Sequence, residues 1–196
     1  PGMPIETTDP DWTERIVERM ISDVEVVKAR FGAEKTIVEN VPYDPSPRYA
    51  IPRPALETAV AKRVVEATGC GFLLDTAHAR IAAMHLGIDP LTYLDQLPGE
   101  QMRELHITGI VYDEQQGRWR DHFQLKADDW TLAEHAFAQI KSGRWASPEV
   151  VAFEYGGVGE MFEWRSEKRV LAHDLPRLDA LIRESALVTD ENRAGH

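Results

Sequence analysis

The sequence contains a single cysteine, Cys70, among its 196 residues, so no disulfide can form within the chain. This cysteine usage is typical of the reducing cytoplasm, and we therefore expect a cytoplasmic location. No apolar run approaches the ~20 residues that a membrane-spanning helix needs, and no signal-peptide pattern opens the chain. We expect neither a membrane protein nor a disulfide-stabilised one. Because Cys70 lies between two glycines, it is expected to be a small packing residue rather than a nucleophile.

Basic residues are also scarce, with 22 lysines and arginines against 33 aspartates and glutamates and a formal net charge of −11. An acidic excess of this size repels phosphate backbones, so nucleic acid is not an expected partner. The length and the 43% of hydrophobic residues suit one domain with a substantial core. We predict a single domain over residues 1–196, with flexible termini at 1–10 and 188–196.

Helical and strand patterns alternate along the chain. The spacing of apolar residues predicts helices over residues 11–30, 55–68, 79–86, 90–97, 130–141 and 168–185, and strands over 36–38, 69–75, 104–108 and 150–154. Segments 41–54 and 112–129 are expected to be irregular. The alternation predicts an α/β fold, a TIM-barrel-like parallel sheet with outer helices. Because eight strands typically need ~250 residues, the barrel is expected to be short or partial. An open sheet, or an edge completed by a second copy in a homodimer, are the alternatives.

The strand that ends at Asp75 gives the first indication of a site. Phe72, Leu73 and Leu74 form a continuous apolar run, which is typical of a strand buried on both faces of a parallel sheet. Functional groups of such sheets gather where the strands end. Asp75 stands at that end and His78 follows about one helical turn later, so the two side chains can share a divalent metal ion. The alternative is that Asp75 caps the next helix and His78 is a surface residue.

The same arrangement recurs at the other predicted strands. Each strand has a potential metal ligand at or near its carboxyl end, and two histidines lie in the loops that follow; the full set is Glu39, Asp75, His78, His106, His122 and Glu154. Because the carboxyl ends of parallel strands lie on one side of a sheet, these groups should converge. Oxygen and imidazole ligands favour iron, manganese or zinc, and a bridging carboxylate allows more than one ion. The structural alternative is that each residue is a helix cap or an ion-pair partner.

Three further residues are candidates for supporting ligands or lining a substrate pocket. They are Asn40, Asp121 and Tyr155, of which Asp121 could orient the neighbouring His122, whereas Tyr155 could equally be a core residue. The histidines on predicted helices are expected to be surface or packing residues; these are His85, His135 and His173.

Four segments of the sequence together resemble a known family. They are Glu39-Asn40-Val41, Leu74-Asp75-Thr76-Ala77-His78, residues 89–98 with the pattern Asp-Pro-x-x-Tyr-Leu-Asp-x-Leu-Pro, and Glu104-Leu105-His106-Ile107-Thr108-Gly109. In this order they resemble the multinuclear non-haem iron-dependent oxidative enzymes. The resemblance implies a TIM-barrel-like fold holding two or three iron ions, which use oxygen to modify cysteines of ribosomally made peptides. It also implies a partner protein or domain that presents the peptide. The six candidate ligands match the metal-binding positions of that family.

The resemblance leads to the expectation of acidic residues at positions 120 and 156, where the sequence has Arg120 and Gly156. It also leads to the expectation of earlier strands that supply further histidines, and the residues before the first predicted helix show no such pattern. A second resemblance is to the xylose-isomerase-like group of sugar isomerases and epimerases, which also place Glu, Asp-x-x-His, His and Glu at successive strand ends. That group implies manganese or zinc, which polarises a substrate oxygen while a carboxylate moves a proton. The third possibility is a non-catalytic barrel that serves as a binding module. Metal content separates the three.

Overall fold

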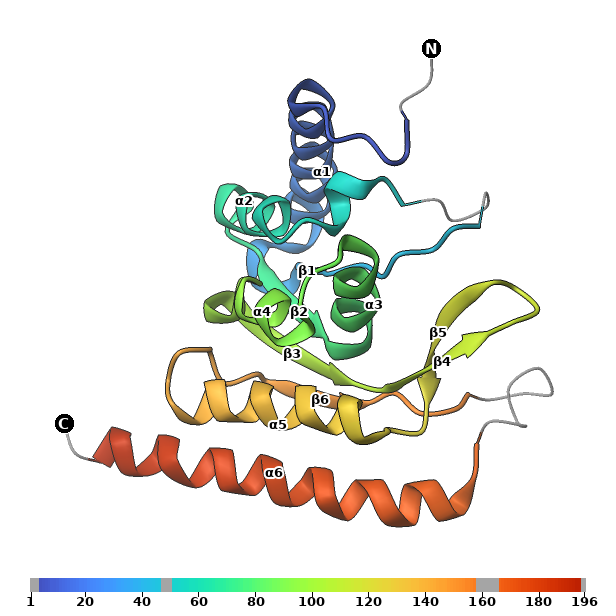
Figure 1. The fold of residues 1–196 in the computed structure, drawn as a ribbon. Helices are drawn as coiled ribbons and strands as arrows, with labels where there is room; N and C mark the ends of the chain where they lie inside the picture. Colours follow the sequence, from blue (N-terminus) through green and yellow to red (C-terminus); the bar gives the residue numbers. More distant parts are fainter. Residues whose placement is uncertain (1–3, 47–50, 158–165, 195–196) are drawn as a thin grey trace.

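The computed structural model describes residues 4–46, 51–157 and 166–194 (Figure 1). Its α-helices are α1 (Pro10–Phe31), α2 (Thr58–Thr68), α3 (Thr76–Leu86), α4 (Pro90–Asp95), α5 (Ala127–Lys141) and α6 (Lys168–Ala194). Its strands are β1 (Ile37–Glu39), β2 (Gly71–Asp75), β3 (Met102–Ile107), β4 (Gly109–Asp113), β5 (Arg118–Phe123) and β6 (Val150–Phe153). Short 3₁₀ turns are η1 (Ala33–Lys35), η2 (Arg53–Leu56) and η3 (Gly99–Gln101).

The four predicted strands form one parallel sheet in the order β1-β2-β3-β6. In this sheet Asp75 of β2 pairs with His106 of β3, and Ile107 pairs with Phe153 of β6. Strand β2 is buried along its whole length, as its apolar run predicts. The expected α/β class and the partial, barrel-like parallel sheet with outer helices are therefore confirmed.

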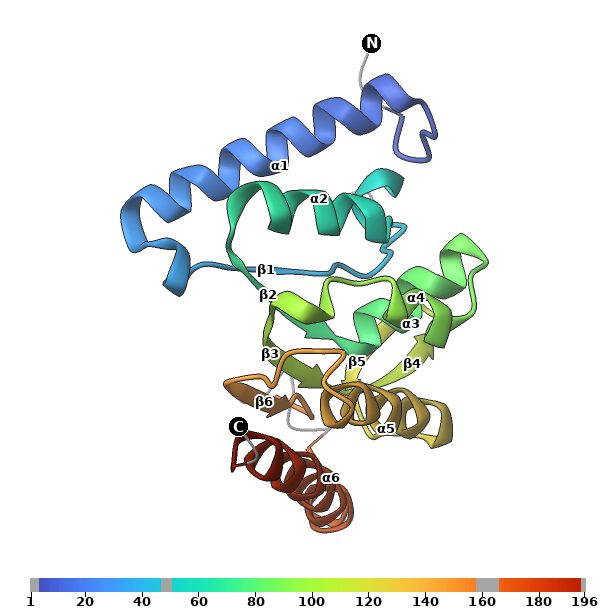
Figure 2. The same cartoon turned by 90° about the vertical axis from the view of Figure 1, so that its left-hand side faces the viewer.

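Helices flank the sheet at both ends of this strand order (Figure 2). Helices α1 and α2 lie beyond β1, α5 lies beside β6, and α6 lies beyond β6. The core between the layers includes Phe72, Leu74 and Leu105, all with less than 1% of their surface exposed. Tyr93 of α4 is also buried and donates a hydrogen bond of 2.5 Å to the Leu56 carbonyl. None of the described helices is both long and apolar enough to cross a bilayer.

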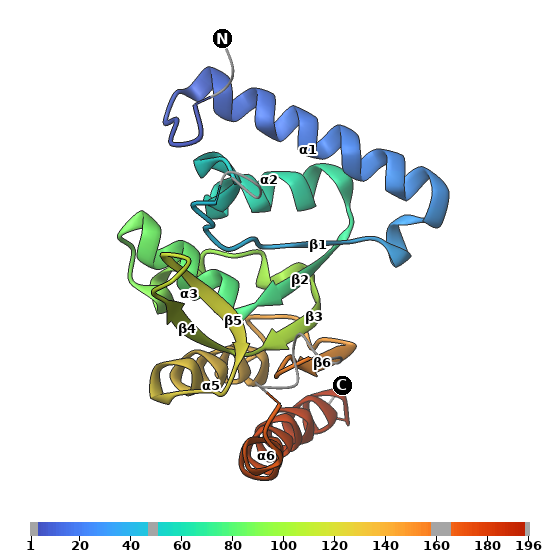
Figure 3. The same cartoon turned by 90° about the vertical axis from the view of Figure 1, so that its right-hand side faces the viewer.

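A β-hairpin occupies most of the segment predicted to be irregular, so that prediction is wrong for residues 112–123. Strands β4 and β5 are antiparallel and project beyond the carboxyl end of β3 (Figure 3). Tyr112 and Trp119 face each other across the hairpin, with ring centroids 5.4 Å apart. Gly117 closes the turn with a φ of 64°, a conformation that glycine adopts without strain.

Several helices begin or end at residues other than those predicted. Helix α3 begins at Thr76, so His78 lies inside its first turn rather than before it. Helix α5 begins at Ala127, earlier than predicted. Helix α6 continues to Ala194, through most of the expected tail. Residues 1–3, 47–50 and 195–196, which belong to the predicted termini and proline-rich loop, lie outside the described residues.

Candidate metal centre

The carboxyl ends of the parallel strands bring the predicted ligands together. Glu39 is the last residue of β1, Asp75 the last of β2, and Glu154 directly follows β6. One ligand atom from each of Glu39, Asp75 and His106 lies within 4.8 Å of the others. Ligand atoms bound to a single ion at about 2.1 Å lie no more than about 4.2 Å apart. Shifts of well under one ångström would therefore bring these three atoms onto one cation.

Asp75 is the buried centre of the site, with no exposed surface. Its Oδ1 accepts a hydrogen bond of 2.8 Å from the backbone N–H of His78, so it caps α3 as the structural alternative proposed. Its Oδ2 has no hydrogen-bond partner among the described residues. Burial raises the pKa of Asp75 to about 6, although the nearby His78 opposes this shift. Capping uses one carboxylate oxygen and leaves the other for a ligand.

Asn40 fixes the position of Asp75. Its side-chain amide donates to the Asp75 carbonyl and accepts from the Asp75 N–H, both at 2.9 Å. Asn40 is itself 96% buried, as its relative exposure of 4% shows. The amide therefore joins the ends of β1 and β2 in the way that a further pair of strand hydrogen bonds would.

His78 lies between two carboxylates from distant parts of the chain. Its Nδ1 is 3.0 Å from Glu39 Oε1 and 3.0 Å from the Asn40 carbonyl oxygen. Its Nε2 is 2.9 Å from Asp121 Oδ2 and 3.9 Å from Asp75 Oδ2. Burial lowers the pKa of His78, but the charge of Asp75 and the contacts with Asp121 and Glu39 outweigh it and raise the pKa to about 11. Asp121 therefore contacts His78 more closely than His122, the residue it was expected to orient.

His106 is held in the same way by β3 and β6. Its Nε2 is 2.8 Å from Glu104 Oε1, and the two residues project from the same face of β3. Its Nδ1 is 3.1 Å from Glu154 Oε1 and 3.9 Å from Asp75 Oδ2. The contact with Glu154 is an ion-pair contact, and no hydrogen bond is assigned to this buried Nδ1 among the described residues. The Glu154 carboxylate raises the pKa of His106 to about 9, against burial and with a contribution from Glu104.

His122 joins the site from the end of the hairpin. Its φ of 64° is unusual for a residue with a side chain. Two backbone hydrogen bonds hold this conformation: the His122 N–H donates to Thr108 Oγ1 and the His122 carbonyl accepts from the Gly156 N–H. The ring Nε2 lies 3.4 Å from Glu154 Oε2 and 3.9 Å from Asp121 Oδ1. Strained residues of this kind are enriched at functional sites.

These contacts connect eight side chains, which we call the carboxylate–histidine cluster: Glu39, Asp75, His78, Glu104, His106, Asp121, His122 and Glu154. All six residues predicted as ligands are in it. Glu104 was missed by the sequence reasoning, although its spacing of two from His106 in a strand places both side chains on one face.

The cluster is strongly acidic, with five carboxylates and three imidazoles. In the described part of the chain, no lysine or arginine forms an ion pair with Glu39, Asp75, Glu104 or Glu154. Arg120, on the same strand as Asp121, is paired with Asp113 at 3.0 Å. The charge, the donor types and the spacing of the cluster fit a divalent cation.

The remaining candidates lie elsewhere. Tyr155 stacks on Phe153 with ring centroids 5.7 Å apart, and its hydroxyl accepts from the Glu167 N–H. The helical histidines pair outside the cluster: His85 with Glu6, His135 with Asp95 and His173 with Asp174. Cys70 is buried, as expected of a packing residue.

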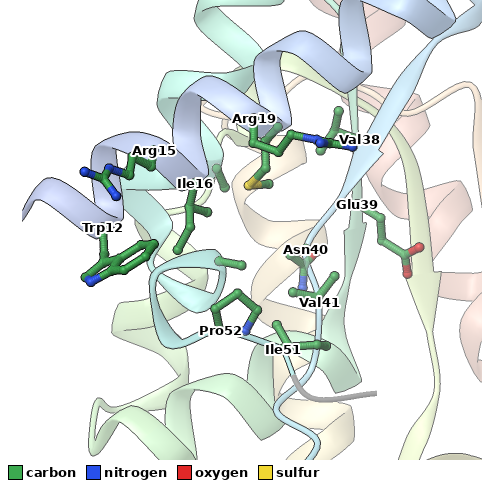
Figure 4. Close-up of a pocket in the computed structure, with 13 residues that line it drawn as sticks. Trp12, Arg15, Ile16, Arg19, Val38, Glu39, Asn40, Val41, Ile51 and Pro52 are labelled. Atoms are coloured by element: carbon green, nitrogen blue, oxygen red, sulfur yellow. The ribbon is translucent and has the colours of Figure 1, made fainter. Parts of the chain in front are cut away.

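A cavity of about 470 Å³ lies between α1 and the outer side of β1 (Figure 4). Trp12, Ile16 and Pro52 contribute to its apolar lining. The Glu39 carboxylate points away from these residues (Figure 4). The cavity is therefore separate from the carboxylate–histidine cluster, although Glu39 borders both.

Comparison with known proteins gives a family match and several relatives. Residues 10–151 match the family model described as "RiPP precursor modification enzyme MbnB/TglH/ChrH", where RiPP denotes a ribosomally made, modified peptide. A UPF0276 protein of Acaryochloris marina is 31% identical over 126 residues, which are 64% of this chain and 37% of that protein. A UPF0276 protein of Rhizobium meliloti is 28% identical over 139 residues, or 71% of this chain and 40% of the relative. The matched part of the chain therefore spans about two fifths of the length of these relatives.

Proposed function

The chain belongs to the MbnB/TglH/ChrH family of RiPP precursor modification enzymes, and on that premise we propose that it forms a metal-dependent oxidative enzyme that modifies cysteine in a ribosomally made peptide. We propose iron as the metal, with two or more ions, and a partner protein or domain that presents the peptide. The enzyme is proposed to work in the cytoplasm. Closure of the sheet by a second copy is compatible with this function.

The observation that carries the proposal is a pair of buried polar atoms without hydrogen-bond partners. Asp75 Oδ2 and His106 Nδ1 lie 3.9 Å apart; neither has an assigned hydrogen-bond partner among the described residues, and the nearest carboxylate contact of Nδ1 is 3.1 Å to Glu154 Oε1. Leaving buried polar groups unpaired costs about 1–3 kcal/mol each, so native structures rarely tolerate it without a functional reason. A carboxylate oxygen and an imidazole nitrogen that face each other at this distance are well matched to a cation.

The donor set is large enough for more than one ion. Asp75 borders both His78 and His106, while Glu154 borders both His106 and His122. Carboxylates that lie between two histidines in this way are suited to bridge two metal ions. We infer that Glu39, Asp75 and His106 hold one ion, and that Asp121, His122 and Glu154 contribute to another.

Bound iron would supply the redox chemistry with oxygen that a cysteine thiol requires. The protein holds and orients the ligands. Asn40 fixes the backbone of Asp75, and Glu104 fixes His106 through Nε2 so that Nδ1 faces the other ligands. Partners of this kind typically strengthen metal binding by 10–100-fold. Burial of Asp75 excludes water from the centre of the site.

Elemental analysis tests this proposal. The protein is produced with supplemented iron, purified without chelators, and analysed by mass spectrometry for iron, manganese and zinc. We expect more than one equivalent of iron. Manganese or zinc near one equivalent would instead favour the isomerase-like alternative, and a metal-free protein would favour a binding module.

A peptide-modification assay complements the elemental analysis. Iron-loaded protein is mixed with a short cysteine-containing peptide and oxygen, and the peptide is examined by mass spectrometry. The matched control is the same peptide with serine in place of cysteine. We expect a mass change in the cysteine peptide alone. No change in either peptide, with iron bound and with the peptide-presenting partner added, would contradict the oxidative function.

A further inference from the structure

A second pocket is lined by residues of the carboxyl-terminal half of α3 and of the hairpin β4–β5. Figures 1 and 3 show that these two elements lie near each other. We call this second pocket the aromatic pocket; its lining includes Tyr43, Ile81, Met84, His85, Tyr112 and Trp119. Its volume is about 230 Å³. Sites for drug-sized ligands usually measure about 300–1,000 Å³, so this pocket is better matched to a single side chain.

The pocket exposes an unusual amount of apolar surface. Tyr112 is 47% exposed, while Met84 and Trp119 are each 36% exposed. Tyr43 and His85 stack face to face on the opposite side, with centroids 3.5 Å apart and an interplanar angle of 6°. Exposed apolar surface that gathers in a hollow often marks a binding site.

The ionisable side chains that line the pocket already have partners of opposite type elsewhere in the chain. His85 Nε2 lies 3.1 Å from Glu6 Oε2. Arg118, which also borders the pocket, forms an ion pair with Asp44. No uncompensated charge at the wall is therefore available to attract a charged group. The occupant that suits this lining is uncharged and apolar.

Two elements connect the aromatic pocket to the cluster at a defined spacing. On α3, His78 lies in the cluster and His85 lies seven residues later on the same helical face. A helix rises 1.5 Å per residue, so the two positions are ~10 Å apart along its axis. On β5, Trp119 and Asp121 are two residues apart and therefore project from one face.

This spacing corresponds to about three residues of an extended peptide. In the polyproline II conformation, residues three apart face the same side and lie ~9 Å from each other. A peptide that places one side chain at the cluster can therefore place another in the aromatic pocket without bending.

We propose that the aromatic pocket binds a bulky apolar side chain of the substrate peptide, located about three residues from the cysteine that is modified. This inference rests on the proposed function, because it takes the cluster as the place where the cysteine reacts. It adds a specificity determinant: the peptide is selected by an apolar anchor as well as by its thiol.

The test uses short peptides of glycine and alanine, with iron(II)-loaded protein under nitrogen and binding measured by calorimetry. The parent peptide carries one cysteine and a phenylalanine three positions after it; a second carries the phenylalanine three positions before. The matched peptides replace phenylalanine by alanine, or cysteine by serine. Burial of one aromatic ring, reduced by the cost of ordering the peptide, should make one phenylalanine peptide bind about tenfold more tightly than its alanine counterpart.

Protein variants assign the preference to the pocket. Trp119→Ala should remove it, whereas Trp12→Ala, which alters the separate cavity beside α1, should leave it unchanged. Circular dichroism checks that each variant is folded. If Trp119→Ala does not fold, Met84→Glu on α3 serves instead, because a charge in the apolar pocket should also abolish the phenylalanine preference.

The two readouts separate this inference from the proposed function. Equal binding of the phenylalanine and alanine peptides, or a preference abolished by Trp12→Ala, would overturn the pocket assignment even if cysteine still contributes. Binding that depends on phenylalanine but not on cysteine would leave the pocket assigned and count against the metal-site chemistry.

Discussion

Replacement of Asn40 by alanine should weaken both the fold and the metal site. Asn40 makes two hydrogen bonds of 2.9 Å with the backbone of Asp75, and alanine would leave that N–H and carbonyl unpaired in a buried position. Each unpaired buried group costs about 1–3 kcal/mol. Because β1 is the edge strand of the sheet, water can reach part of the gap, and we expect a total loss of about 2–4 kcal/mol.

Urea denaturation measures this loss. With a typical dependence of about 2 kcal/mol per molar urea, the midpoint should fall by about 1–2 M. The amount of iron bound per protein should decrease as well. The Asn40 side chain would no longer hold the backbone of Asp75, and the contact of His78 with the carbonyl of residue 40 would shift. The control is Gln139→Ala. This change removes another buried side-chain amide, which donates a hydrogen bond from α5 to Asp95 of α4 and is not part of the cluster. It should lower stability without lowering the iron content.

The reasoning would be refuted if Asn40→Ala moved the urea midpoint by less than about 0.3 M, since the two hydrogen bonds would then contribute almost nothing. A large stability loss with unchanged iron content would refute the second step. In that case Asn40 would support the fold without positioning Asp75 for a ligand.

Three further predictions concern the ligands. His106→Ala should lower the amount of bound metal, measured by elemental analysis, at least tenfold. His135→Ala, which changes a histidine paired with Asp95 outside the cluster, should leave the metal content unchanged. Equal effects of the two changes would contradict the ligand assignment. Glu104→Gln should weaken metal affinity about 10–100-fold in a competition titration while leaving the fold intact, since Glu104 orients His106; an unchanged affinity would remove that role. Metal binding at pH 7.5 should release protons, because ligating histidines must be neutral while the pKa values of His78 and His106 are raised to about 11 and about 9. Calorimetry in buffers of different ionisation enthalpy measures this release, and identical heats in all buffers would exclude it.

The sequence predicts the parallel sheet well because its strands have simple patterns. The apolar run before Asp75 predicts a strand buried on both faces, and the structure buries this strand completely. The convergence of Glu39, Asp75, His106 and Glu154 follows from the same reasoning, because strand direction alone places their carboxyl ends at one edge.

The hairpin could not be predicted as readily, because its stability depends on contacts between strands rather than on a continuous apolar run. Strand β5 reads Arg-Trp-Arg-Asp-His-Phe and is largely polar, so its pairing with β4 is visible only once Tyr112 faces Trp119. A glycine at the end of a short polar segment, Gly117, was the available signal.

The hairpin also explains how Asp121 and His122 both reach the cluster. Side chains of adjacent residues in a regular strand point to opposite faces. At His122 the backbone leaves strand geometry, with a φ of 64°, and both side chains then contact the cluster. Sequence reasoning based on regular strands cannot anticipate such a turn.

This local geometry bears on the departure at Arg120. The family resemblance leads to the expectation of an acidic residue at position 120, where this chain has an arginine that pairs with Asp113. The next residue, Asp121, does contact the cluster: its Oδ2 lies 2.9 Å from His78 Nε2, and its Oδ1 lies 3.9 Å from His122 Nε2. Because the Asn40 carbonyl can accept a hydrogen bond from His78 Nδ1, we propose that the Nε2 beside Asp121 is the nitrogen that would bind a cation. In this chain the carboxylate beside His78 Nε2 is therefore that of Asp121.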